Sequence, residues 1–221
     1  MNVQLIAHTP EPEKTCALAG RLCYSGFSIE ELTKKITPTV ITDILSRIIS
    51  SEHLSVLEHA SFTFAIEGVS RALLAQLTRH RIASYSVQSQ RYVKFKDALE
   101  YVVPPEIKSK ELLAKMYDDA ARQIKSLYDT LLVEGIAPED ARYILPQAST
   151  TKIILTMNAR ELRHFFSLRC CNRAQWEIRD MACRMLTEAA AVAPILFSGA
   201  GPDCRRDGCH EDKPCGTPWK K

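Results

Sequence analysis

Apolar side chains recur at every third or fourth position along several stretches of the chain, the spacing of helices with one buried face. The clearest stripe runs from Ile41 to Ile49 and follows Thr37-Pro38, a helix start signal. Ser70 and Asn158 are N-cap candidates, and Glu161 follows Asn158 at the spacing of a capping box. The predicted helices cover residues 41–49, 71–81, 108–135, 159–170 and 173–194.

Strands are predicted where apolar and polar residues alternate. Phe62, Phe64 and Ile66 would face one side of a half-buried strand at residues 60–68, which ends at Gly68. Further strands are predicted at residues 2–7 and 152–158. The fold class that follows is α+β: a single helix-rich domain with a mostly antiparallel sheet, covering residues 1–200. A loosely ordered, Cys-rich tail is expected at residues 201–221.

Composition narrows the class of protein. The net charge of +3 over 221 residues is too small for a broad basic surface, which disfavours a nucleic-acid-binding protein. No apolar run approaches the roughly 20 residues of a transmembrane helix. The N-terminus, MNVQLIAHTP, lacks the basic start and apolar core of a signal peptide. We therefore expect a cytoplasmic protein that binds neither nucleic acid nor membrane.

The eight cysteines are expected to be reduced thiols, because the chain is long and shows no secretion signal. Four potential metal ligands fall close together in the tail: Cys204, Cys209, His210 and Cys215. Their spacing lacks the paired C-x2-C of common structural zinc sites, and adjacent Cys209 and His210 would strain to bind one ion. We predict no metal site, with a zinc-binding tail as the alternative.

Two segments concentrate cationic donors. RHRIASYSVQSQRY, from Arg79 to Tyr92, holds three arginines and a histidine but no carboxylate. The segment NARELRHFFSLRC, from Asn158 to Cys170, contains four basic residues but only one acidic residue, Glu161. Guanidinium groups bind phosphate through paired hydrogen bonds, so both segments favour an anionic ligand. The alternatives are an exposed basic face for the first segment and salt bridges to distant acids for the second.

A third polar segment, SEHLSVLEHASF, contains His53, Glu58 and His59. It differs in order and spacing from the H-E-x-x-H motif of metalloproteases. Taken alone, it is equally consistent with a solvated loop.

Together these segments resemble one family. Arg79-His80-Arg81, seven residues and then Ser89 match the R-H-R-x7-S signature of flavin-dependent thymidylate synthases. Collinear segments extend the resemblance from His53 through HASFTF, RYILP and NARELRHF to LRCCNRAQWEIR. The resemblance implies a homotetramer with active sites shared between subunits. It also implies FAD as cofactor and conversion of dUMP to dTMP, with methylenetetrahydrofolate as carbon donor and NADPH as reductant.

The resemblance also implies roles for individual residues. The FAD-binding positions would be His53, Ser55, Arg79, His80, Arg81, Asn158, Arg160 and His164. The dUMP-binding positions would be Gln76, Arg79, Val87, Gln88, Ser89, Gln90, Arg91, Arg142 and Arg169.

Two of these positions depart from the family. His164 stands where relatives often have asparagine, and Val87 where an acidic residue is frequent, so any contact there uses backbone or Gln88. Arg169 is the expected catalytic residue, which would stabilise negative charge on the uracil. Ser89 has no evident base beside it and is expected to bind phosphate or ribose rather than act as a nucleophile.

Overall fold

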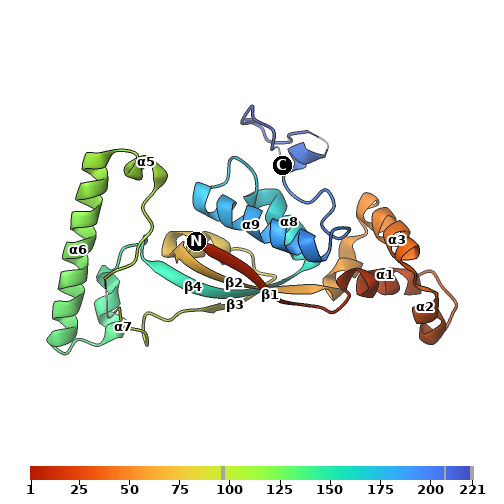
Figure 1. Cartoon of the computed structure of the whole chain (residues 1–221), viewed down its shortest axis with the longest axis horizontal. Helices are drawn as coiled ribbons and strands as arrows, with labels where there is room; N and C mark the ends of the chain where they lie inside the picture. Colours follow the sequence, from red (N-terminus) through yellow and green to blue (C-terminus); the bar gives the residue numbers. More distant parts are fainter. Residues whose placement is uncertain (96–97, 207, 220–221) are drawn as a thin grey trace. The chain divides into compact units, whose positions relative to one another are not determined.

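The computed structural model describes residues 1–95, 98–206 and 208–219. Its four strands form one antiparallel sheet in the order β1-β2-β4-β3 (Figure 1). The strands are β1 (Asn2–His8), β2 (Ser61–Ser70), β3 (Ser84–Val87) and β4 (Thr150–Asn158). The α+β, helix-rich fold class with an antiparallel sheet is therefore confirmed.

The chain divides into two compact units. The first comprises Met1–Asn2, Ile66–Arg79 and Ser86–Ile153, and the second comprises Val3–Ala65, His80–Tyr85 and the chain from Ile154 onward. The boundary falls within β2 and β4, so each unit holds part of both strands. The division into a domain at residues 1–200 and a tail at residues 201–221 stays a prediction.

In the sequence, the helices of the first unit all lie between β2 and β4. Ser70 caps the first of them, because its side chain accepts a hydrogen bond from the Leu73 N–H at 3.0 Å. Figure 1 shows the long helix of this unit beside a shorter one. The helices are α4 (Arg71–Leu77), α5 (Pro105–Lys108), α6 (Glu111–Val133), α7 (Pro138–Ala141) and the 3-10 helix η2 (Arg142–Ile144).

The second unit holds the remaining helices. They are α1 (Pro12–Leu22), α2 (Ile29–Lys35), α3 (Pro38–Ser50), α8 (Ala159–Arg169), α9 (Trp176–Val192) and the 3-10 helices η1 (Leu54–His59) and η3 (Asp203–Arg205). Helix α1 packs against α3 and η1. Gly20 permits this approach, because a Cβ atom there would lie 2.6 Å from the Ile48 Cδ1 atom.

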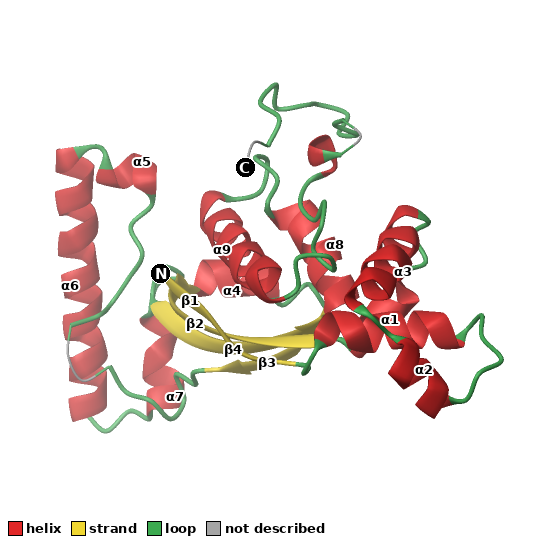
Figure 2. Cartoon of the chain, turned by 45° about the vertical axis from the view of Figure 1, so that its right-hand side comes forward, coloured by secondary structure: helices red, strands yellow, loops and turns green. Residues whose placement is uncertain are grey.

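An aromatic cluster forms the core of the second unit, where α8 and α9 lie side by side (Figure 2). Phe62 of β2 is fully buried, and its ring centroid lies 5.2 Å from that of Phe197. Phe197 in turn lies 5.9 Å from Phe166, which lies 5.7 Å from Phe165 on α8. Burying aromatic side chains stabilises such a core strongly, so the cluster fixes α8 against the strand.

Several predicted boundaries are confirmed and others are wrong. Thr37, Ser70 and Asn158 are N-caps. The first and last residues of α3, α6, α8 and α9 each lie within three residues of the predicted ones. Strand β2 does not end at Gly68 but passes through it to Ser70, with Gly68 at a φ of +69°. The helix expected at residues 71–81 ends at Leu77, and β3, α1, α2 and α7 were not predicted.

Within the described ranges, no helix is both long and apolar enough to cross a membrane. All eight cysteines are free thiols, with Cys16 and Cys170 buried. Part of the tail contacts the turn after α8: the Asn172 side-chain amide donates to the Thr217 carbonyl at 2.8 Å. No three His, Cys, Asp or Glu side chains among the described residues are grouped to hold a metal ion.

Candidate functional site

Helix α8 carries several of the predicted site residues of the second unit. It begins at the N-cap Asn158, whose Oδ1 accepts a hydrogen bond from the Glu161 N–H at 2.8 Å. Leu162, Phe165 and Phe166 bury one side of the helix. Arg160 and His164, one turn apart, are exposed instead, and partly exposed Arg169 ends the helix.

A chain of hydrogen bonds joins Glu161, His80 and Arg169. The Arg169 Nε–H donates to His80 Nε2 at 3.0 Å, and His80 Nδ1 lies 3.3 Å from Glu161 Oε1. Arginine has only donors, so His80 Nε2 must be the acceptor, which places the imidazole proton on Nδ1 toward the carboxylate. The arrangement therefore selects one tautomer of His80.

The environment keeps His80 neutral. Its residue surface is only 6% exposed, and burial lowers the pKa of the imidazole to about 4, helped by the charges of Arg169 and His164. Burial also raises the pKa of Glu161, while the charge of His164 lowers it. Burial and the Glu161 charge raise the pKa of Tyr85 to about 12, so its hydroxyl stays protonated and donates to the His80 carbonyl at 2.7 Å.

A second group of predicted residues lies beside α8, because η1 packs against that helix. The Arg160 guanidinium forms an ion pair with Glu58 of η1. His53 and Ser55, at the start of η1, are exposed, as is Arg81 after the buried His80. The structure therefore brings the predicted FAD-binding residues of the second unit to α8 and its neighbouring segments.

Arg163 contributes to the fold rather than to this site. It is buried, and its guanidinium donates to the carbonyl oxygens of Leu196 and Ser198 at 2.7 and 2.9 Å. Burial lowers its pKa to about 10, with smaller effects from the charges of Arg206 and Arg205. It remains charged at neutral pH, and carbonyl oxygens supply its partners. The donor excess read from the sequence therefore overstated the number of cations available for a ligand.

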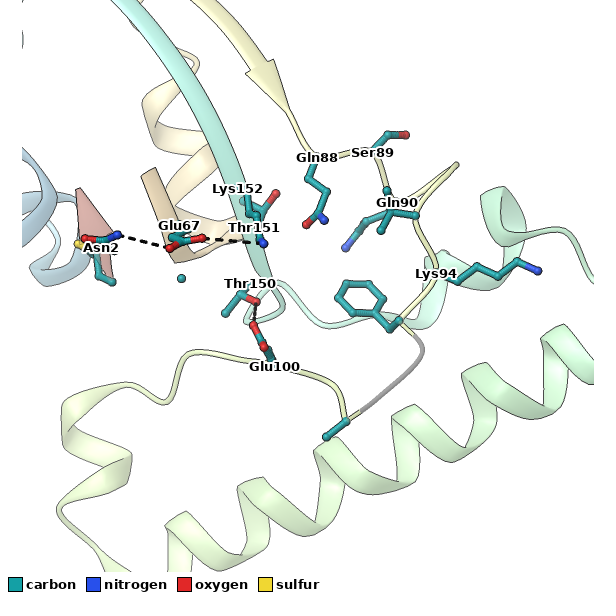
Figure 3. Close-up of a pocket in the computed structure, with 15 residues that line it drawn as sticks. Asn2, Glu67, Gln88, Ser89, Gln90, Lys94, Glu100, Thr150, Thr151 and Lys152 are labelled. Atoms are coloured by element: carbon teal, nitrogen blue, oxygen red, sulfur yellow. Dashed lines mark hydrogen bonds and ion pairs between the residues drawn. The ribbon is translucent and has the colours of Figure 1, made fainter. Parts of the chain in front are cut away.

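The first unit contains a polar pocket of about 590 Å³ between β4 and the segment after β3 (Figure 3). Gln88 and Gln90 point toward β4, whereas Lys94 points away. The Gln88 N–H donates to the Lys152 carbonyl at 2.9 Å, which holds this segment against the strand. Ser89 also lines this pocket, and its hydroxyl accepts a hydrogen bond from the Arg91 N–H at 3.1 Å. Three predicted dUMP-binding residues thus share one pocket.

A second pocket of about 460 Å³ in this unit carries two arginines. Burial lowers the pKa of Arg71, and the charge of Arg142 lowers it further, which shows that the two guanidinium groups repel. An anion between such groups would relieve the repulsion. The same pocket is lined by Gln90, Tyr143 and Gln147. Arg71, Tyr143 and Gln147 were not among the residues predicted from the sequence. Arg71 resembled an ordinary first residue of a helix.

The other predicted positions of the first unit are spread over its surface. Arg91 forms an ion pair with Glu139, whose carbonyl also accepts from Arg142 Nε at 3.0 Å. Gln76 and Arg79 were expected on one helical side, but α4 ends at Leu77, so Arg79 lies beyond the helix. Arg79 is exposed, and Val87, the last residue of β3, is half-buried.

Residues 4–195 match the protein family described as "Thymidylate synthase complementing protein". A flavin-dependent thymidylate synthase of Geobacter sulfurreducens is 52% identical over 212 residues, which is 96% of this chain and 91% of that protein. The enzyme of the same name from Clostridium tetani is 46% identical over 227 residues, again 96% of this chain and 91% of the relative.

Two solved structures share the fold. The flavin-dependent thymidylate synthase ThyX of Helicobacter pylori, complexed with FAD and dUMP, has a TM-score of 0.74 and 26% identity, covering 91% of this chain and 100% of that chain. A UMP/dUMP methylase, PolB of Streptomyces cacaoi, bound with 5-Br dUMP, has a TM-score of 0.75 and 25% identity, covering 90% and 95%.

The neutral state of buried His80 predicts a loss of stability in acid. The unfolded chain takes up a proton near the ordinary value of 6.5, whereas folded His80 does so only at about 4. The free energy of unfolding should therefore fall between these pH values, by up to about 3 kcal/mol. The raised pKa of Glu161 acts in the opposite direction and offsets part of this loss.

Urea denaturation of the wild type and His80→Gln at several pH values would isolate the histidine contribution. The stability advantage of the wild type over His80→Gln should shrink as the pH falls from 6.5 to about 4. A difference that stays constant over this window would contradict the prediction.

Proposed function

Because the chain belongs to the flavin-dependent thymidylate synthase family, we propose that it is the enzyme that methylates dUMP to dTMP with FAD as its cofactor. Methylenetetrahydrofolate provides the carbon, and NADPH provides the reducing equivalents. The observation that carries the proposal is the arginine held at the end of α8 by a neutral histidine. A guanidinium fixed in this way can stabilise charge that develops on a substrate ring.

The FAD-binding residues surround α8. Exposed Arg81, His53, Ser55, Arg160 and His164 fit an anionic, aromatic cofactor, because they offer guanidinium, imidazole and hydroxyl donors on neighbouring segments. Arg79 and Asn158 complete the proposed set. His80 has both ring nitrogens engaged within the chain, so we propose that it serves the site by holding Arg169. FAD supplies the hydride transfer that amino-acid side chains cannot provide.

The dUMP-binding residues divide between phosphate and base. Gln90 lines the pocket of about 460 Å³ together with Arg71 and Arg142. The guanidinium groups of these two arginines repel each other, which favours binding of the dianionic phosphate there. Gln88, Ser89 and Arg91 flank Gln90 in the chain, and Gln76, Arg79 and Val87 complete the proposed dUMP-binding set. Arg169 is proposed to face the uracil, where its charge stabilises negative charge on the ring as C5 becomes nucleophilic.

The active sites are proposed to be shared between the subunits of a homotetramer. Helix α6 exposes apolar side chains that a single chain leaves uncovered: Leu112 is 71% exposed, Met116 59% and Leu127 51%. Exposed apolar side chains on one helix are typical of an interface between subunits. The cytoplasmic location expected from the sequence remains a prediction.

The first test is spectroscopic. The purified protein should bind FAD, and dUMP should then perturb the visible flavin spectrum, because the two ligands share one site. Titration of the protein with FAD, followed by dUMP, measures both events, with dCMP as the control nucleotide. A protein that binds no FAD, or whose flavin spectrum does not respond to dUMP, would contradict the proposed function.

Arg169→Ala and Arg91→Ala should affect different kinetic constants. The phosphate is charged throughout the reaction, so loss of Arg91 weakens the ground state and the transition state about equally and raises KM for dUMP. Charge on the uracil grows only during the reaction, so loss of Arg169 should lower turnover by about a hundredfold. Arg169→Lys should recover little, because an ammonium does not reproduce the planar guanidinium.

Single-turnover oxidation of reduced flavin at saturating dUMP, combined with dUMP titration, separates these two effects. Wild-type oxidation rates in Arg169→Ala would show that another residue activates the uracil.

Shared sites also predict complementation. If Arg142 and Arg169 reach one site from different subunits, a mixed oligomer of Arg142→Ala and Arg169→Ala should contain some sites with both arginines. Mixing after dissociation should therefore restore part of the activity, whereas each variant treated alone should stay inactive. Full activity in a monomer, measured by light scattering and assay together, would rule out sharing.

A further inference from the structure

We infer that Glu161 is a positioning residue for Arg169. By accepting a hydrogen bond from His80 Nδ1, it holds the imidazole tautomer whose Nε2 accepts the Nε–H of Arg169. The inference rests on the proposed function for the role of Arg169, but the geometry of the three side chains is independent of it. Glu161 was not among the residues expected to serve the site.

Glu161 is placed where a helix ordinarily uses a glutamate for capping. Helix α2 gives the internal comparison: the Glu31 carboxylate accepts from the backbone N–H of its own N-cap, Ser28, at 3.0 Å, while the Ser28 hydroxyl accepts from the Glu31 N–H. At α8 only the half that involves Asn158 Oδ1 is made. The Glu161 carboxylate is instead buried beside His80, at 8% exposure of the residue.

The surroundings of His80 restrict its ring. The Phe165 ring lies edge-on at a centroid distance of 4.9 Å, and the His164 ring lies at 6.0 Å. Among the residues that the structure describes, the charged or titratable groups facing His80 are Glu161, His164, Arg169 and Tyr85. Of these, only Glu161 offers an acceptor to Nδ1. The ring is thus fixed by packing and the position of its proton by the carboxylate.

Removing the carboxylate should release this arrangement. The Nδ1–H of His80 would then be buried without its acceptor, which is costly enough to favour the other tautomer or a rotated ring. The other tautomer carries a proton on Nε2 and cannot accept from Arg169. Arg169 would then lose the acceptor that orients its Nε–H, while its own charge would be unchanged.

The test uses full-length, FAD-loaded protein labelled with ¹⁵N-histidine. In the wild type, the His80 signals, assigned by their loss in His80→Gln, should show a protonated Nδ1 and an unprotonated Nε2 at neutral pH. Glu161→Leu should lose this single tautomer, whereas Glu161→Gln keeps an acceptor oxygen of equal reach and should retain it. Glu188→Gln, an exposed glutamate on α9, is the matched control.

Kinetics then separates positioning from a purely structural role. Glu161→Leu should lower kcat by about tenfold, the effect typical of a residue that orients a ligand-binding group, with KM for dUMP nearly unchanged. Glu161→Gln and Glu188→Gln should stay near the wild type. Thermal unfolding of each variant shows whether the comparison is between folded proteins.

Two results would overturn the inference. One is a wild-type His80 with its proton on Nε2, a measurement that does not depend on any variant folding. The other is a folded Glu161→Leu protein that keeps the wild-type tautomer or the wild-type kcat. The tautomer is read without substrate, so a protein that fails to make dTMP but shows the expected signals would disprove the proposed function and leave the positioning role intact.

Discussion

The structure of the second unit depends on the burial of α8 by aromatic side chains. Phe165 and Phe166 lie on the buried side of this helix, and ring contacts continue through Phe197 to Phe62 of β2. A close-packed aromatic cluster tolerates little displacement, so the rotation of α8 about its own axis is fixed. The opposite end of the same cluster touches His80, because Phe165 packs against its ring. This packing therefore determines which side of α8 faces outward.

The arginines in and near the candidate site fall into two groups with different consequences. Arg163 is satisfied by backbone carbonyls, and Arg160 and Arg91 are paired with Glu58 and Glu139. Burial and the charge of Arg142 instead lower the pKa of Arg71, and Arg169 donates to a neutral imidazole. A neutral partner holds a guanidinium in place without neutralising it. His80 therefore orients Arg169 without cancelling its charge.

The sequence pattern was sufficient for elements with strong periodicity. Phe62, Phe64 and Ile66 are buried as their alternation predicted, and the caps at Thr37, Ser70 and Asn158 are formed. Strand β3 was missed because its four residues, Ser84–Val87, are held by pairing with β4 rather than by local preference. Gly68 was read as a strand end, although a positive φ also allows a strand to continue through a local distortion.

Candidate site residues could be proposed from the sequence where a motif carries them, but not where the fold brings distant residues together. The segment from Arg79 to Arg91 was recognisable from its composition, because it is basic and contains no carboxylate. Arg71 gave no such signal, because its closeness to Arg142 depends on how the chain folds. The spacing of Asn158 and Glu161 did predict a cap correctly. It could not reveal that the glutamate side chain turns away from the cap to His80, since that contact joins residues 81 positions apart.

These contacts bear on how the uracil is activated. The Cys170 thiol is fully buried, and the hydrogen bond with Cys183 together with burial raises its pKa, so it is a poor source of the thiolate that attacks a ring. The Ser89 hydroxyl accepts from the Arg91 N–H within its own turn, and among the described residues no side chain that could act as a base is hydrogen-bonded to it. Neutral His80 has one nitrogen facing Glu161 and the other occupied by Arg169, so it is unsuited to remove a proton from a substrate. What this arrangement offers the substrate is a fixed positive charge, and a developing anion is the species that such a charge stabilises.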